Sequence, residues 1–145
     1  MSRVLVVEDH PPLATVVAIG LRRLGHEVVR VGSVERALSA EGDFDGAVVD
    51  IELPDGTGVE LARELLDSER VQTVVFYTAT RDPGLKLEAL KLGPIVDKMG
   101  NLEELLEVTS SELERVAQRA RAAGAGDVVV TAHATAKSGT RRRVR

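Results

Sequence analysis

The residues best suited to chemistry are a small set of charged and hydroxyl side chains, each placed after a short apolar run. They are Glu8, Asp9, Asp50, Thr78 and Lys98. Continuous apolar runs of this kind are typical of strands buried on both faces inside a parallel sheet. Because the carboxyl ends of parallel strands meet at one edge, where open α/β sheets bind ligands, we expect these side chains to converge there.

Three carboxylates gathered at one edge would repel one another unless a cation joined them. Oxygen ligands without histidine or cysteine suit Mg²⁺, which keeps several waters and often bridges to a phosphate. The hydroxyl of Thr78 and the ammonium of Lys98 would complete a cradle for a dianion. A carboxylate such as Asp50 is also a competent nucleophile for forming an aspartyl phosphate. The set therefore predicts a magnesium-dependent phosphoryl site.

Five apolar runs alternate with five helical patterns along the chain. The expected strands are residues 4–7, 28–31, 47–49, 73–77 and 95–97, and the helices between and after them are expected to begin near Pro11, Ser33, Thr57, Asp82 and Asn101. Crossover helices make such a sheet parallel, with right-handed connections. The prediction is an α/β fold with a five-stranded parallel sheet in the flavodoxin-like order 2-1-3-4-5, helices on both faces and an extended last helix.

The starts of the helices carry recognisable signals. Pro11 and Pro12 suit a first helical turn, where missing N–H groups matter little. Ser33 and Asn101 are good N-cap residues, and Thr57 with Glu60 matches a capping box. These signals predict where four of the five helices begin without any reference to tertiary structure.

The carboxyl-terminal part of the chain changes in composition at Gly124-Ala125-Gly126, which is typical of a linker. We expect a domain over residues 1–123 and a flexible basic tail or truncated linker over 124–145. The last helix should run from Asn101 to Ala123. Its apolar and small residues Leu102, Leu106, Thr109, Leu113, Val116 and Ala120 have coiled-coil spacing. Either Leu102 to Thr109 face the core and the rest of the helix frays, which we prefer, or the face pairs two chains in a homodimer.

Composition and charge exclude several classes of protein. Cysteine is absent, so neither a disulfide framework nor a thiolate metal site is available. No apolar run approaches the ~20 residues of a membrane span, and the amino terminus does not resemble a signal peptide, so we expect a cytoplasmic protein without membrane contact. The net charge is −4, which divides into +4 for residues 124–145 and −8 for residues 1–123. The acidic body therefore disfavours nucleic-acid binding, and any binding through the tail would be weak and salt-sensitive.

The chain resembles a response-regulator receiver domain of two-component signalling over residues 3 to about 115. The matching marks are the acid pair Glu8-Asp9, the loop Asp50-x-x-x-Pro54-x-x-x-Gly58, the pair Thr78-Ala79, and Lys98. The resemblance implies that Asp50 accepts a phosphoryl group from a histidine kinase or phosphotransfer protein. It also implies that the chain is no enzyme beyond catalysing its own phosphorylation and dephosphorylation.

The resemblance further implies roles for the surrounding groups. Asp9, Asp50 and the main-chain carbonyl of Glu52 would bind Mg²⁺, with Glu8 reaching the ion through water. Thr78 and Lys98 would hold the phosphoryl oxygens. Positioning and charge stabilisation account for most of the catalysis of phosphoryl transfer, so a metal ion and a lysine are chemically sufficient.

Two positions depart from the pattern of the family. Ile95 stands where an aromatic residue usually turns inward when the threonine moves, and Met99 replaces a proline after the lysine. Neither change touches the site chemistry, but Ile95 has no ring to move between two pockets. Glu52 and Thr80 stand at positions that tune dephosphorylation in the family.

Other functions remain open at this point. The chain could be a receiver-like interaction module that works without phosphorylation, although the full set of Asp50, Thr78 and Lys98 argues against this. It could also be a regulator that contacts nucleic acid weakly through its basic tail. A nucleotide-binding enzyme is disfavoured, because the turn after residues 4–7 is Glu8-Asp9-His10-Pro11-Pro12 and lacks a glycine-rich phosphate loop.

Overall fold

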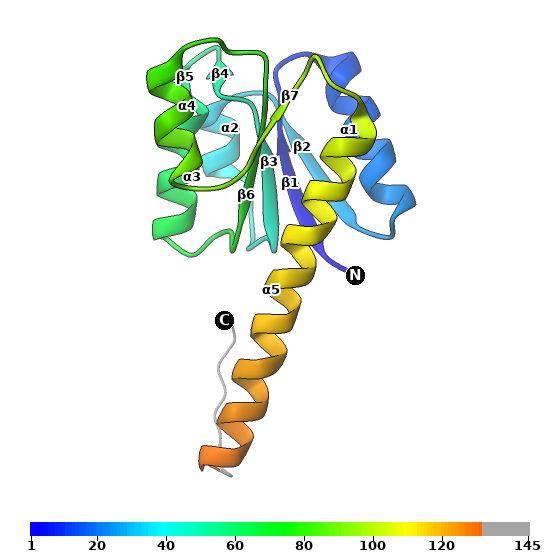
Figure 1. The fold of residues 1–145 in the computed structure, drawn as a ribbon, viewed down its shortest axis with the longest axis vertical. Helices are drawn as coiled ribbons and strands as arrows, with labels where there is room; N and C mark the ends of the chain where they lie inside the picture. The colour runs from blue at the N-terminus through cyan, green and yellow to red at the C-terminus, as the bar shows by residue number, and fades with distance from the viewer. Residues whose placement is uncertain (132–145) are drawn as a thin grey trace. The chain divides into compact units, whose positions relative to one another are not determined.

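A computed structural model describes residues 1–131 and shows a parallel sheet of five strands (Figure 1). The strands are β1 (Arg3–Val7), β2 (Glu27–Val31), β3 (Gly46–Val49), β6 (Val74–Thr78) and β7 (Ile95–Asp97). Their order across the sheet is β2-β1-β3-β6-β7, and every neighbouring pair is parallel. In chain order of the large sheet this is 2-1-3-4-5, which confirms the predicted flavodoxin-like topology.

Helices cover both faces of the sheet, as predicted (Figure 1). They are α1 (Pro11–Arg23), α2 (Val34–Ser39), α3 (Gly58–Asp67), α4 (Pro83–Leu90) and α5 (Leu102–Thr131). The residues that pack together show which helices share a face: α2, α3 and α4 lie on one side, and α1 and the start of α5 lie on the other. The sheet and the helices that cover it belong to one compact unit, Met1–Leu113.

The core consists of two apolar layers, one on each face of the sheet. Successive residues of β1 alternate between them: Leu5 and Val7 face the layer of α2, α3 and α4, whereas Val4 and Val6 face α1 and α5. This alternation follows from the two-residue period of a strand. All four of these side chains are fully buried. β1 therefore has the continuous apolar sequence of a strand that is covered on both faces.

The predicted helix caps are present. Ser33 Oγ accepts a hydrogen bond from Arg36 N, Thr57 Oγ1 accepts one from Glu60 N, and Asn101 Oδ1 accepts one from Glu104 N. Asp82 Oδ1 caps α4 by accepting from both Gly84 N and Leu85 N. Local sequence therefore defines the starts of these helices, because each cap satisfies an N–H group that the helix leaves unpaired.

A small hairpin that the sequence did not reveal follows Asp50. Strands β4 (Glu52–Leu53) and β5 (Gly56–Thr57) pair antiparallel, where we expected only a turn. Asp55, at the tip of this hairpin, accepts hydrogen bonds from Val34 N and Glu35 N at 2.8 and 3.0 Å. One carboxylate thus attaches the hairpin to the amino terminus of α2.

We expect Asp55→Ala to lower stability in a pH-dependent way. The backbone hydrogen bonds from Glu35 and Val34 hold the pKa of Asp55 below its ordinary value. A carboxyl whose pKa is lower in the folded state stabilises the fold above its unfolded pKa and loses that contribution as the pH falls through the folded pKa. The difference in free energy of unfolding between wild type and Asp55→Ala should therefore be largest near neutral pH and should shrink below about pH 4.

Urea unfolding at neutral and acidic pH measures this difference. Asp55→Asn is the matched control, because the amide keeps one acceptor oxygen but cannot titrate, so its deficit at neutral pH should be smaller. An Asp55→Ala deficit of equal size at both pH values would show that Asp55 does not act through its charge.

The last helix is longer than predicted. We expected it to end near Ala123, but α5 continues through Thr131, so that prediction is wrong. Gly124 is helical and lies in open space. Glycine weakens a helix by only about 1 kcal/mol, which the many helix-favouring alanine and arginine residues before it offset. The expected tail therefore begins with eight helical residues, and its remainder, residues 132–145, lies outside the described residues.

Over the first three turns of α5, the residues with coiled-coil spacing pack in the core of the same chain and not against a second chain. Leu113 and Thr109 are buried, and Leu102 and Leu106 pack with α1 against the sheet. The preferred interpretation is thus supported for Leu102 to Thr109. The expected fraying after them is wrong, because Leu113 is also buried in the core and the helix continues through Thr131. Leu113→Glu would disrupt this layer, so that substitution would not be a clean test of pairing between chains.

Candidate functional site

All five residues that the sequence singled out for chemistry reach the same edge of the sheet. Glu8 directly follows β1, Asp50 follows β3, and Lys98 follows β7, while Thr78 is the last residue of β6. Main-chain hydrogen bonds hold the strand ends in register: Asp50 N donates to Val7 O, and Lys98 N donates to Thr78 O, both at 3.0 Å. The expected convergence at the carboxyl ends of parallel strands is confirmed.

Lys98 lies between two carboxylates. Its Nζ is 2.8 Å from Glu8 Oε1 and 2.8 Å from Asp50 Oδ2. The two acids are each only 6% exposed, and the side chain of Lys98 is 18% exposed. Removal from water strengthens the attraction between opposite charges, and it also makes an unpaired charge costly. The lysine therefore balances carboxylates that would otherwise be buried without a cation.

Burial and ion pairing shift the pKa values of Glu8 and Lys98, and both are raised. Burial raises the pKa of Glu8 above its ordinary value, although the hydrogen bonds from Lys98 and His10 oppose the shift. Burial lowers the pKa of Lys98, but the hydrogen bonds and charges of Asp50 and Glu8 outweigh it, so that the pKa of Lys98 is raised overall. Lys98 thus keeps its positive charge at neutral pH.

Glu8, Asp9 and Asp50 form a cluster that could hold a metal ion. One carboxylate oxygen from each lies within 4.8 Å of the others, with Glu8 and Asp50 buried and Asp9 exposed. Oxygen ligands at this spacing, with one open side, fit a divalent cation that retains waters. Both oxygens of Glu8 already have partners, since Oε1 contacts Lys98 and Oε2 accepts from His10 N at 3.0 Å.

The loop after Asp50 is shaped by a close approach of two backbone segments. Gly58 N donates to Ile51 O at 2.7 Å. A Cβ atom at position 58 would lie 2.0 Å from the main-chain oxygen of Asp50, which no residue other than glycine can accommodate. Gly58 therefore lies in direct contact with the main chain of Asp50. The hairpin between them brings Glu52 N to 3.2 Å from Asp50 Oδ1.

Two threonines at the end of β6 are hydrogen-bonded to each other. Thr78 Oγ1 accepts from Thr80 N at 3.2 Å, and both residues are buried. Thr80 Oγ1 in turn contacts Glu52 Oε2 at 3.2 Å. The resemblance identified Glu52 and Thr80 by their positions in the family pattern but did not indicate that they touch. Their contact across the site depends on the tertiary structure.

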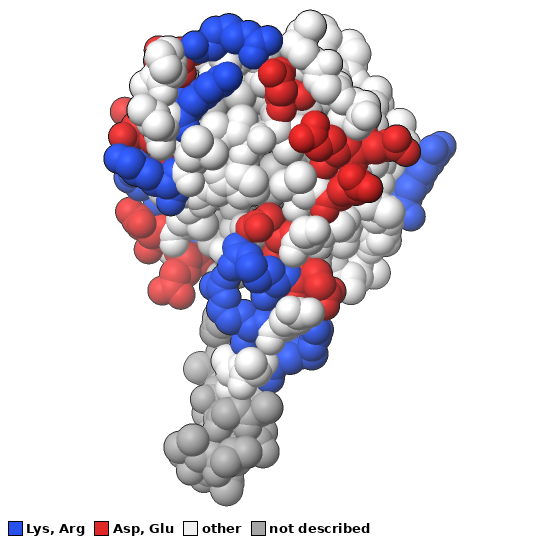
Figure 2. Space-filling view, in the orientation of Figure 1, with Lys and Arg blue, Asp and Glu red and all other residues white. Residues whose placement is uncertain are grey.

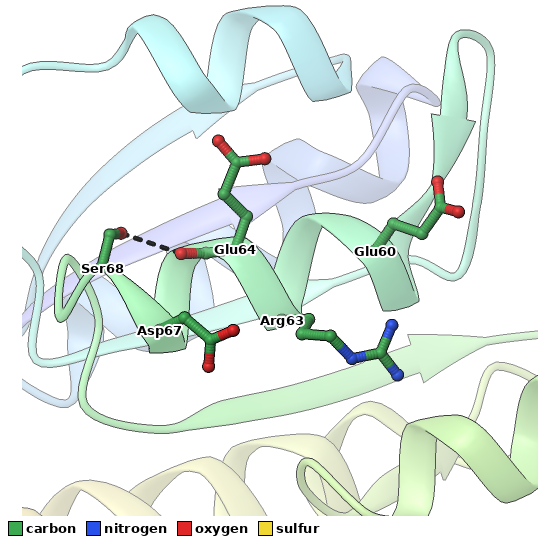
Figure 3. Close-up of a pocket in the computed structure, with 5 residues that line it drawn as sticks. All are labelled: Glu60, Arg63, Glu64, Asp67 and Ser68. Carbon is green, nitrogen blue, oxygen red and sulfur yellow. Dashed lines mark hydrogen bonds between the residues drawn. The ribbon is translucent and has the colours of Figure 1, made fainter.

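A shallow hollow elsewhere on the surface does not share this chemistry. It follows α3 and is lined by Glu60, Arg63, Glu64, Asp67 and Ser68 (Figure 3). Ser68 Oγ bonds back to the main chain of Glu64, and Arg63 pairs with Glu88 of α4 at 3.2 Å. These contacts describe the solvated face of a helix and not a second site.

Comparison with known proteins agrees with the fold. The family model of the response regulator receiver domain matches residues 4–110. The chain belongs to this family. The receiver domain is a signalling domain of two-component response regulators, so the resemblance stated from the sequence is confirmed.

Individual relatives are transcriptional regulators that are longer than this receiver domain. The chain is 36% identical to the transcriptional regulatory protein CutR of Streptomyces coelicolor over 93 residues, which cover 63% of the chain and 43% of CutR. It is 32% identical to the transcriptional regulatory protein TcrA of Mycobacterium tuberculosis over 103 residues, which cover 70% of the chain and 36% of TcrA. The chain thus spans less than half the length of either relative.

Solved structures show the same receiver fold. The response regulator TrrA of Thermotoga maritima, in complex with Mg²⁺ and BeF, is 28% identical, with a TM-score of 0.69 over 77% of this chain and 99% of TrrA. The BeF3-activated receiver domain of DrrB is also 28% identical, with a TM-score of 0.72 over 79% and 98% of the two chains. Within residues 1–131, no helix of the receiver domain has both the length and the apolar character needed to cross a membrane.

The two departures from the family pattern lie at the start of β7 and directly after Lys98. Ile95, the first residue of β7, pairs with Phe76 in the sheet and packs against the layer of α2, α3 and α4. Met99 is 76% exposed. Tyr77 lies in the opposite layer, with α1 and α5, so it points away from the side occupied by Phe76 and Ile95. It does not take the place of the missing aromatic residue.

Proposed function

We propose that Asp50 is the phosphoacceptor of this receiver domain. A carboxylate oxygen of Asp50 would attack the phosphorus of a phosphohistidine, and the bond between phosphorus and the histidine nitrogen would break as the aspartyl phosphate forms. The observation that carries this proposal is the environment of Asp50. It is a nearly buried carboxylate at the edge of the sheet, 2.8 Å from the ammonium of Lys98 and within 4.8 Å of the acids Glu8 and Asp9.

Mg²⁺ would be held by Asp9, Asp50 and the main-chain carbonyl of Glu52, with Glu8 bound to it through water. The chemistry of these oxygen ligands supports the proposal, as does the solved complex of the related TrrA with Mg²⁺ and BeF. The ion would neutralise charge on the phosphoryl oxygens. Thr78 would donate a hydrogen bond and Lys98 an ionic contact to the remaining oxygens.

We expect Asp9→Ala to weaken Mg²⁺ binding severely and Glu8→Ala to weaken it less. Asp9 is exposed and can turn toward an ion, whereas both oxygens of Glu8 are occupied by Lys98 and the His10 N–H. Calorimetric titration with Mg²⁺ measures both variants. The exposed Asp67→Ala on α3 is the control for loss of one negative charge at a distance and should bind as wild type does. Equal affinity in wild type and Asp9→Ala would refute this placement of the ion.

The partners follow from the phosphoryl chemistry. A histidine kinase or a phosphotransfer protein would supply the group, and the phosphorylated form would change its contacts with other proteins. In this proposal the chain works in the cytoplasm, and its only catalysis is its own phosphorylation and dephosphorylation.

Acidic and basic side chains are mixed over the face of the sheet domain drawn in Figure 2, so that face supports no extended contact with nucleic acid. A homodimer through the coiled-coil face of the last helix would have to use residues beyond Leu113, because Leu102, Leu106 and Leu113 of that face pack in the core.

Treatment with acetyl phosphate and Mg²⁺, followed by intact-mass spectrometry, tests the proposal. A covalent phosphoryl group on wild type supports the phosphorylation-dependent receiver. Its absence would favour the alternative of an interaction module that works without phosphorylation.

A further inference from the structure

The buried hydroxyl of Thr80 joins two segments that flank the proposed phosphoryl site. Thr80 is 3% exposed. Its Oγ1 is 3.2 Å from Glu52 Oε2 and 3.3 Å from Asp82 N. The carboxylate can only accept and the N–H can only donate, so the hydroxyl must donate to Glu52 and accept from Asp82. One side chain therefore connects the hairpin after Asp50 to the residue that caps α4.

The main chain of Thr80 adds a third connection. Its N–H donates to Thr78 Oγ1 at 3.2 Å. A hydroxyl can donate and accept at once, so donation to a phosphoryl group does not by itself cost this bond. If the Thr78 side chain rotated to bring its oxygen to a phosphoryl group on Asp50, however, the oxygen would move away from Thr80 N and the bond would weaken or break. Thr80 would then be left with a buried N–H that has lost its acceptor, which is an unfavourable state that favours movement of the segment.

Phosphorylation would disturb the Glu52 end of the bridge as well. Glu52 N lies 3.2 Å from Asp50 Oδ1, so the hairpin that carries Glu52 is in direct contact with the acceptor carboxylate. A phosphoryl dianion on Asp50 would repel the nearby Glu52 carboxylate. The hydrogen bonds of Thr80 with Thr78 and with Glu52 would therefore both change on phosphorylation.

The far end of the bridge is the start of α4. Asp82 N donates to the Thr80 hydroxyl, while Asp82 Oδ1 caps α4 through Gly84 N and Leu85 N at 2.9 and 3.2 Å. A shift of Thr80 would move Asp82 and loosen this cap. The neighbouring strand β7 offers no comparable polar link at Ile95, which packs as an aliphatic side chain in the core.

We infer that Thr80 is a positioning residue that transmits phosphorylation of Asp50 to α4 through its hydrogen bonds to Glu52, Thr78 and Asp82. In this receiver domain the threonine bridge takes the place of a moving aromatic ring. The inference rests on the proposed function, because it requires that Asp50 be phosphorylated. It predicts that the response is concentrated in residues 79–86 and that β7 responds little.

Amide hydrogen exchange with and without beryllofluoride and Mg²⁺ tests the inference, and native mass spectrometry of the same samples reports whether the phosphate mimic has bound. In wild type the mimic should speed exchange at residues 82–86 by roughly threefold to tenfold, as expected for the loss of one or two hydrogen bonds. Thr80→Val keeps the shape of the side chain but removes the hydroxyl. In this variant, exchange at 82–86 should already be fast and should not change further when the mimic binds.

Thr80→Ser is the matched control, because it restores the hydroxyl and should restore the wild-type response. A second pair examines the contact of Thr80 with Glu52. Glu52→Gln keeps an acceptor for Thr80 but removes the repulsion by the phosphoryl group, so exchange at 82–86 without the mimic should be that of wild type and the response to the mimic should be smaller. Glu52→Met removes the acceptor and should behave like Thr80→Val. The Glu52 pair keeps the inference testable if Thr80→Val folds poorly.

Three results would overturn the inference while leaving the proposed function intact. The first is mimic-bound wild type with unchanged exchange at 82–86, and the second is a Thr80→Val response equal to that of wild type. The third is large changes in exchange across residues 95–100, because they would show that β7 carries the signal. Failure of wild type to bind the mimic or accept a phosphoryl group would instead refute the proposed function, and the inference with it.

Discussion

Incubation with acetyl phosphate and Mg²⁺ should add one phosphoryl group to the wild-type chain and none to Asp50→Asn. The amide is close in shape to the carboxylate but is a poor nucleophile and carries no charge for Mg²⁺ or Lys98. Asp50 Oδ2 lies 2.8 Å from Lys98 Nζ, so the substitution also removes a partly buried ion pair at the reacting atom. Intact-mass spectrometry counts the phosphoryl groups directly.

Asp67→Asn is a suitable control for this experiment, because it makes the same chemical change on the exposed face of α3. It should accept one phosphoryl group as wild type does. Removal of Mg²⁺ with a chelator should abolish the modification of both proteins. An unmodified wild-type mass under saturating donor would disprove the assignment, and a modified Asp50→Asn would mean that another residue is the acceptor.

Gly58→Ala should cause a large loss of stability together with a loss of site function. The new Cβ would lie 2.0 Å from Asp50 O and 2.8 Å from Val49 Cγ1, well inside van der Waals contact. To remove this steric clash, the backbone of Asp50 or the start of α3 would have to move, which would break the hydrogen bond from Gly58 N to Ile51 O. Forced overpacking of this kind destabilises by about 3 kcal/mol or more.

The effect on Mg²⁺ binding and phosphorylation should be comparably strong. A displacement of about 1 Å in a catalytic group can lower a rate by about a hundredfold. Urea unfolding and phosphorylation by acetyl phosphate, measured on the same preparation, report the two effects. We expect both to fall in Gly58→Ala, because the segment that destabilises the fold is the one that positions Asp50.

Gly124→Ala is the matched control for the change from glycine to alanine. No atom lies within 4 Å of a Cβ built at Gly124, and the residue is within α5. Alanine favours a helix more than glycine does, so stability should be unchanged or slightly higher. If Gly58→Ala were as stable and as readily phosphorylated as Gly124→Ala, the close approach at Asp50 would not exist in the molecule.

Much of the architecture could be predicted from short-range patterns. The apolar runs that end at Glu8, Asp50 and Lys98 identified buried strands, and alternation with helices implied a parallel sheet with a right-handed crossover at each step. The caps at Ser33, Thr57 and Asn101 are local hydrogen bonds, so they depend on neighbouring residues alone. The site was predictable for the same reason, because its residues follow the strand ends and topology then brings those ends together.

Other features required the tertiary structure because they depend on distances between segments that are remote in sequence. Composition could not show that Asp55 caps α2, that Thr80 reaches Glu52, or that Lys98 pairs with Glu8. The end of α5 was mispredicted for a different reason: two glycines resemble a linker, yet the modest helix penalty of each can be outweighed by the residues around it. The sequence by itself determined which chemical groups arrive at the edge of the sheet, since strand periodicity and chain order decide that. Only the folded structure decided which groups contact one another there, because hydrogen bonds and ion pairs form over about 3 Å and depend on how hairpin, loop and helix pack in three dimensions.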